Sequence, residues 1–247
     1  MQIKDRAICL RAVDFSETSQ VVTLLTRQHG KIAAMAKGSR RPKNRFDGPI
    51  EIFSRGEAVF IAKESGGLAA LTEFNQEPPF TAFAQNIEIL YSALFGAELT
   101  EHFLKEHDPH PELFDTFTAF LETLQKETSA CRTLAWLILY QIRLLDKIGL
   151  APVWDRCTNC AAALPEKTAK KPSAVYFSSR NNGLLCVACE QAFVEKRAVQ
   201  PAVVGVLAEP SKLPVTEIHI LQEIERLLIY HITELLGKAP KMAGHFT

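Results

Sequence analysis

The sequence has no long hydrophobic run. None of its 247 residues lie in an uninterrupted apolar stretch of about 18, the length that a membrane-spanning helix requires. The first residues, Met-Gln-Ile-Lys-Asp-Arg, also lack the apolar core of a signal peptide. We therefore expect no transmembrane helix, no membrane partner and a cytoplasmic location.

The sequence is also poor in catalytic motifs. It contains no Gly-x4-Gly-Lys-Ser/Thr phosphate loop, no Gly-x-Ser-x-Gly nucleophile turn and no kinase motif set. Its seven histidines are scattered, and the loose cluster of His102, His107 and His110 lacks the i, i+4 spacing of a helical metal site. This pattern favours a binding protein over an enzyme.

Net charge is absent overall, but positive charge is concentrated locally. Lysines and arginines number 28, and so do aspartates and glutamates. Residues 37–45 nevertheless hold five cations and no acid, and Gly38 and Pro42 predict a loop there. The positive charges of such a loop repel one another unless they bind a polyanion, which indicates a nucleic-acid-binding loop. The alternative interpretation is a solvated, mobile loop without a ligand. The candidate nucleic-acid-binding residues are Lys37, Arg40, Arg41, Lys43 and Arg45, with Arg27 and Lys31 in support.

Cysteines are few, yet four of the six are ordered as two Cys-x2-Cys pairs. Cys157 and Cys160 precede a gap of 25 residues, and Cys186 and Cys189 follow it. Two such pairs supply the four thiolates of a tetrahedral zinc site. We expect a zinc ribbon over residues 154–190 with one structural Zn²⁺ per chain. Two redox pairs or two disulfides are the alternatives.

Residues 1–79 show short strand patterns separated by turn residues. Strand-like runs occupy residues 6–13, 19–26, 31–37, 50–54, 57–63 and 68–74. Five or six strands in so short a segment predict a small closed barrel. An oligonucleotide-binding (OB) barrel and an SH3-like barrel both fit this pattern.

Residues 80–247 have a helical texture that begins after the Pro78-Pro79 linker. Helices are predicted at residues 111–126, 131–148 and 216–236, the last capped by Thr216 and Gly237. The residues after Gly237 are expected to fray. The predicted fold class is therefore α+β: a barrel followed by a helical domain with the zinc ribbon inserted in it.

Several motifs in fixed order give the chain a wider resemblance. The first half carries Asp-Phe-Ser-Glu-Thr-Ser at 14–19, His-Gly-Lys at 29–31 and Lys-Gly-Ser-Arg-Arg at 37–41. The second half carries Gly-Leu-Ala-Pro at 149–152 before the first cysteine pair, and Gly-Leu-Leu at 183–185 before the second pair. In this order the motifs resemble the RecO family of recombination mediators. Asn44 is a departure, since a small hydroxyl residue is expected there.

The resemblance implies an N-terminal OB fold, a helical domain and a zinc finger. It further implies binding to single- and double-stranded DNA, annealing of complementary strands, and association with the nucleoid. The partners that it implies are RecR, single-strand-binding protein and RecA. Lys167, Lys170, Lys171 and Arg180 form a second candidate phosphate surface. A protein–protein adaptor without a DNA role and a zinc-dependent nucleic-acid enzyme are the rival hypotheses.

Overall fold

The fold is known from a computed structural model that describes residues 2–62, 67–164 and 174–246. The chain forms two compact units, Met1–Gln85 with Ala97–Gln125, and Asn86–Gly96 with Lys126–Thr247. Helix α2 (Ile87–Phe103) contributes residues to both units. Among the described helices, none combines the length and the hydropathy needed to cross a bilayer.

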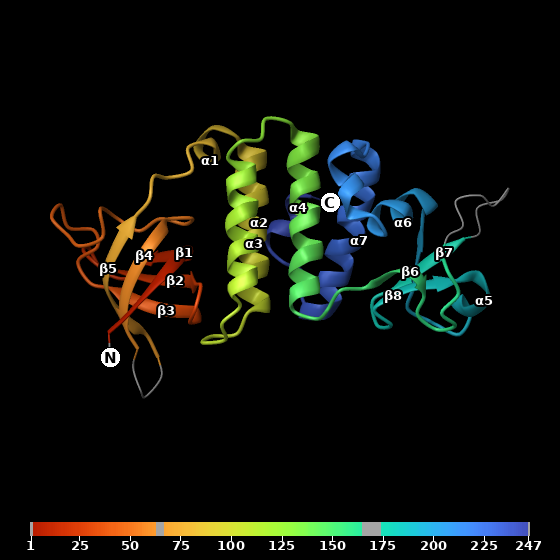
Figure 1. Cartoon of the computed structure of the whole chain (residues 1–247), viewed down its shortest axis with the longest axis horizontal. Coiled ribbons are helices and arrows are strands. Elements are labelled where there is room, and N and C mark those ends of the chain that lie inside the picture. Colours follow the sequence, from red (N-terminus) through yellow and green to blue (C-terminus); the bar gives the residue numbers. More distant parts are fainter. Residues whose placement is uncertain (1, 63–66, 165–173, 247) are drawn as a thin grey trace. The chain divides into compact units, whose positions relative to one another are not determined.

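Five strands in the first unit close into a barrel (Figure 1). They are β1 (Gln2–Asp14), β2 (Gln20–Thr26), β3 (Gly30–Ala36), β4 (Arg55–Ile61) and β5 (Ala69–Gln76). Strands β1, β2 and β3 form an antiparallel meander, β3 pairs in parallel with β5, and β4 pairs with both β5 and β1. The order β1-β2-β3-β5-β4 is that of an OB fold, so the SH3-like alternative is excluded.

Alternating burial builds the barrel core. In β3, Ile32, Ala34 and Ala36 are buried, and between them lie partly exposed side chains, as the two-residue period of a strand requires.

The predicted strand at residues 50–54 is wrong. Phe53 has a φ of +68°, which no strand tolerates, and its N–H donates to the Cys9 carbonyl at 2.8 Å. The buried side chains of Ile50 and Phe53 give this segment its apolar, strand-like pattern.

Helices complete the first unit beyond the barrel. The short helix α1 (Ala82–Gln85) and α3 (Pro111–Leu124) both belong to it, and α3 buries Leu113, Phe117 and Leu121 on one face. The Gly30 turn requires glycine, because its φ is +71° and a Cβ would lie 2.4 Å from the Asp108 carbonyl oxygen.

The second unit is built on α4 (Ala130–Lys147) and α7 (Ile218–Leu236), with α6 (Pro201–Leu207) and η1 (Pro210–Val215) beside them. Gly237 ends α7 with a φ of +69°, as predicted, but the N-cap is Glu217 and not Thr216. The predicted fraying of the tail is also wrong. Residues Met242–His245 form η2, and Phe246 stacks on Phe95 with ring centroids 5.4 Å apart.

A second, smaller sheet lies in the second unit (Figure 1), and two of its strands end at cysteines. Its strands are β6 (Val153–Cys157), β7 (Val175–Ser178), β8 (Gly183–Cys186) and β9 (Arg197–Val199), in the order β6-β8-β7-β9. The short helix α5 (Val187–Glu190) follows β8. Phe177 is fully buried, stacks on Trp154 at 5.1 Å and meets the edge of His231 from α7 at 5.4 Å. The sheet is thus anchored on α7.

Candidate metal centre and nucleic-acid interface

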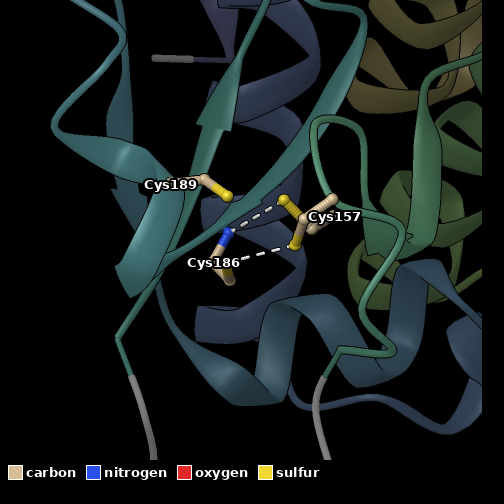
Figure 2. A group of neighbouring side chains, drawn as sticks. Cys157, Cys186 and Cys189 are labelled. Atoms are coloured by element: carbon tan, nitrogen blue, oxygen red, sulfur yellow. Dashed lines mark hydrogen bonds between the residues drawn. The ribbon is translucent and has the colours of Figure 1, made fainter.

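The four cysteines converge on one point. Cys157 ends β6, Cys160 lies in the turn after it, Cys186 ends β8 and Cys189 lies in α5. Their sulfur atoms all lie within 4.8 Å of one another, and the Cys160 and Cys186 sulfurs are 3.7 Å apart. Figure 2 shows the side chains of Cys157, Cys186 and Cys189 directed toward one another. The structure therefore brings together all four predicted ligands.

Glycine at position 183 permits this convergence. Its φ is +154°, and a Cβ there would lie 2.7 Å from the Val153 carbonyl oxygen. The close approach lets Thr158, inside the first cysteine pair, donate from its N–H to the Leu184 carbonyl at 2.8 Å. The two pairs are thereby linked to each other by backbone as well as by their sulfur atoms.

The thiols are in unequal environments. Burial raises the pKa of Cys157, but N–H groups of Cys160, Cys186 and Asn159 outweigh it and lower that pKa to about 6. The Cys186 N–H lies 3.4 Å from the Cys157 sulfur (Figure 2). The Asn159 amide donates to the Cys189 sulfur at 3.3 Å and lowers its pKa, yet the neighbouring sulfurs of Cys186 and Cys160 raise it to about 12. Crowding of the four sulfurs thus disfavours ionising all of them together unless a cation binds among them.

The donor set fits zinc. Four sulfurs placed about 2.3 Å from one tetrahedral Zn²⁺ lie about 3.8 Å apart, close to the Cys160–Cys186 spacing of 3.7 Å. Disulfides would need sulfurs about 2.05 Å apart. A zinc ion held by four thiolates would have no position left for a reactive water, which is typical of a structural site.

The basic loop, residues 37–54, connects β3 and β4 and is held in place by two amide side chains. Buried Gln20 accepts from Ser39 Oγ at 2.9 Å and from the Ile50 N–H at 3.0 Å. Asn44 donates to the carbonyls of Ser39 and Arg41, at 2.9 and 2.7 Å, and its Oδ1 accepts from the Phe46 N–H at 2.7 Å. An amide side chain can donate two hydrogen bonds and accept another at the same time, whereas a hydroxyl group can donate only one. This difference explains asparagine at this position.

Four of the seven predicted binding residues have partners within the unit. Arg27 makes a paired contact with Asp115, with both distances 2.9 Å, and this hydrogen bonding raises the pKa of Arg27. The Lys31 ammonium donates to the Glu101 carbonyl. Arg40 pairs with Asp14 at 2.7 Å and Arg45 with Glu73 at 3.7 Å. Arg27 and Lys31 thus hold the barrel to the 97–125 segment.

Lys37, Arg41 and Lys43 are exposed and have no acidic partner within residues 2–62, 67–164 and 174–246. The Arg41 side chain lies over Gly38, whose Cβ, if present, would be 3.4 Å from Arg41 Cδ. All three cations line a groove of about 610 Å³. Met35 and residues 68–72, at the start of β5, supply most of the apolar lining. The groove combines positive charge with an apolar lining.

The second candidate phosphate surface is only partly described. Arg180 is exposed, and its N–H donates to Glu195 at 3.1 Å. Lys167, Lys170 and Lys171 lie outside the described residues.

Fold and site together define a class: an OB-fold chain with a basic β3–β4 loop, followed by helices and a tetracysteine ribbon. Family comparison gives the particular family. The model "Recombination protein O N terminal" matches residues 1–79, and "Recombination protein O C terminal" matches residues 84–243. The chain belongs to the RecO family.

Curated relatives agree with this assignment. A Rhodopirellula baltica protein named DNA repair protein RecO is 34% identical, over 74% of this chain and 65% of that protein. A Myxococcus xanthus protein of the same name is 31% identical, over 81% of this chain and 78% of that protein. The same name belongs to a Bacillus pumilus protein at 28% identity, over 96% of this chain and 90% of that protein. The match to the first of these spans just under two thirds of that relative's length.

Two parts of the site escaped the sequence reasoning. The β5 residues of the groove come more than 20 residues after Arg45 in the sequence, and only barrel closure places them beside the loop. The role of Asn44, whose side chain hydrogen-bonds the loop backbone, was also not predicted. Its signal was present, because asparagine after a Gly- and Pro-containing basic run is typical of a residue that bonds neighbouring backbone.

Proposed function

We propose that this chain is a DNA-binding recombination mediator in DNA repair. It binds single- and double-stranded DNA, anneals complementary strands, and acts with RecR to load RecA on DNA covered by single-strand-binding protein. Family membership and the relatives' names support the repair role. The observation that carries DNA binding is the groove lined by Lys37, Arg41 and Lys43.

Binding would begin with phosphates at these three cations. Their charge is not offset by acids in the described structure, and the loop is already ordered by Gln20 and Asn44, so little ordering entropy is lost on binding. Arg40 and Arg45 would add to the surface by exchanging their carboxylates for phosphate. Exposed ion pairs contribute only about 0–1 kcal/mol, so this exchange is inexpensive.

Annealing follows from the same charge. Two complementary strands repel each other through their phosphates, and cations that neutralise phosphates of one strand lower that repulsion. The chain's residues therefore hold and shield strands, without a covalent step. In this proposal residues 1–79 are the DNA-binding domain and residues 80–247 are the helical domain.

Zinc would be held by Cys157, Cys160, Cys186 and Cys189 and would supply folding energy to the ribbon at residues 154–190. The ribbon's apolar core is small, centred on Phe177 and Trp154, which is why a metal is needed there. We place no DNA contact on the metal itself.

A second candidate function, that of a protein–protein adaptor, is favoured by an apolar groove of about 580 Å³ in the second unit. Its walls include Trp136, Leu139, Ile142, Pro152 and Leu207. A peptide from a partner such as single-strand-binding protein or RecR would fit such a groove. As a mediator, the chain would use both surfaces; as an adaptor, it would use this groove alone.

Annealing of two complementary labelled oligonucleotides separates the two functions. The test variant is Arg41→Gln with Lys43→Gln, and the matched control is Lys4→Gln with Lys105→Gln, which removes equal charge at exposed positions of the same unit. A mediator that uses the basic loop loses annealing rate in the test variant only. Equal rates in wild type, test and control would exclude a DNA role for the loop.

A further inference from the structure

One exposed aromatic side chain in the first unit has no role in the core. Phe15 is 67% exposed, although it is a large apolar residue on a barrel whose other phenylalanines are buried. It lies in the turn between β1 and β2, where its N–H donates to the Ser19 carbonyl at 2.9 Å. A single exposed apolar side chain is common on a protein surface, so the meaning of Phe15 depends on what lies beside its turn.

The turn that carries Phe15 is joined to the basic loop by three contacts. Asp14, the residue before Phe15, pairs with Arg40 at 2.7 Å. The Arg40 N–H donates to the Thr18 carbonyl at 3.2 Å, and the Gly38 N–H donates to Ser19 Oγ at 3.3 Å. The turn that carries Phe15 is therefore held against the loop at Gly38 and Arg40.

This juxtaposition has a chemical meaning. A surface that binds single-stranded nucleic acid combines cations for the phosphates with aromatic rings on which bases stack. Every base has a flat face, so such stacking needs no particular sequence. In a duplex those faces are already stacked on their neighbours and are not available to a protein ring.

We propose that Phe15 stacks on an unpaired base and gives the basic loop a preference for single-stranded over double-stranded DNA. This inference rests on the proposed function, because it assumes that phosphates lie at the basic loop. The turn supplies the base contact, and Lys37, Arg41 and Lys43 supply the phosphate contacts. Preference for single strands then comes from one ring and not from the cations.

The test is a set of binding titrations with full-length protein. Three probes are needed: a single-stranded oligonucleotide, a hairpin-closed duplex, and an abasic strand with the same number of phosphates. We expect Phe15→Ala to bind the single strand about five- to 150-fold more weakly, the range that loss of one stacked base gives. Its affinity for the duplex and the abasic strand should equal that of wild type.

Further variants separate stacking from general apolar contact and from misfolding. Phe15→Trp should restore single-strand affinity, whereas Phe15→Leu, apolar but not flat, should not. Val194→Ala, which shortens a fully exposed valine of the second unit, is the control for losing surface apolar area. Wild-type circular dichroism for Phe15→Ala is expected because the side chain packs against no core.

The two proposals fail in different ways. If Phe15→Ala binds the single strand like wild type while Arg41→Gln with Lys43→Gln binds it weakly, stacking by Phe15 is overturned and the basic loop stands. If the charge variant binds the single strand like wild type, the role of the basic loop is overturned, and the proposal for Phe15 falls with it. A loss on the abasic strand equal to that on the natural strand would also contradict stacking.

Discussion

The carboxyl group of Glu225 is buried, where its ionised form is unfavourable. It lies on α7, fully buried, and its two oxygens accept from the Gln141 amide of α4 at 2.8 and 2.9 Å. Burial raises the pKa of Glu225 to about 8, and the Gln141 hydrogen bonds lower it by less. The substitution Glu225→Gln keeps the shape, removes the charge, and leaves groups that can both donate to and accept from Gln141.

The sign of the effect follows from the two pKa values. The folded pKa of about 8 exceeds the ordinary value of 4.5, so the folded state binds this proton more strongly. The stability from Glu225 is fully present below pH 4.5 and is lost as the pH rises toward 8. Between pH 5 and pH 7.5 the loss is about 3 kcal/mol, at about 1.4 kcal/mol per pH unit. Glu225→Gln has no such group to ionise. Its free energy of unfolding relative to wild type should therefore rise by about 3 kcal/mol between pH 5 and pH 7.5.

Urea unfolding at pH 5 and pH 7.5, followed by tryptophan fluorescence, measures this gain. Both tryptophans, Trp136 and Trp154, lie in the second unit with Glu225, so the signal reports on that unit. Glu234→Gln, at an exposed position of the same helix, is the control. A stability difference between Glu225→Gln and wild type that does not change with pH would refute the reasoning, because Glu225 would then be ionised in the fold.

Two further predictions concern the metal centre. Elemental analysis should find about one zinc per chain, and Cys189→Ser should lower the zinc content and the Tm of the second unit without changing DNA affinity; a fully folded, metal-free wild type would contradict this. Gly183→Ala should destabilise the same unit by about 1–3 kcal/mol, because its Cβ would meet the Val153 carbonyl at 2.7 Å with φ at +154°; unchanged urea unfolding would show that the ribbon can shift.

Local patterns allowed much of the fold to be predicted. Strand alternation located β1 to β5, and the cap at Gly237 located the end of α7. The two Cys-x2-Cys pairs identified the metal centre, because such a turn places two sulfurs at one point whatever surrounds it. The choice of an OB over an SH3-like barrel needed the strand order, which depends on pairings distant in sequence.

What could not be predicted depends on tertiary contacts. The 50–54 segment has an apolar pattern like that of a strand, and only Cys9 pairing with Phe53 and Ser54 shows it to be a turn. The tail after Gly237 is polar enough to fray, yet Phe95 and Tyr91 pack on Phe246 and His245. Similarly, five loop cations with two more in support were predicted to bind, and the fold separates the three without acidic partners in the described residues from the four that are engaged.

The central claim is that cations of the β3–β4 loop bind DNA phosphates, and the salt dependence of single-strand affinity tests it most directly. Each phosphate contact contributes about −0.7 to the slope of log K against log salt concentration. For Arg41→Gln with Lys43→Gln, the slope should become shallower than that of wild type by about 1.4. The Lys4→Gln with Lys105→Gln control should keep the wild-type slope. Identical slopes for all three proteins would contradict the claim.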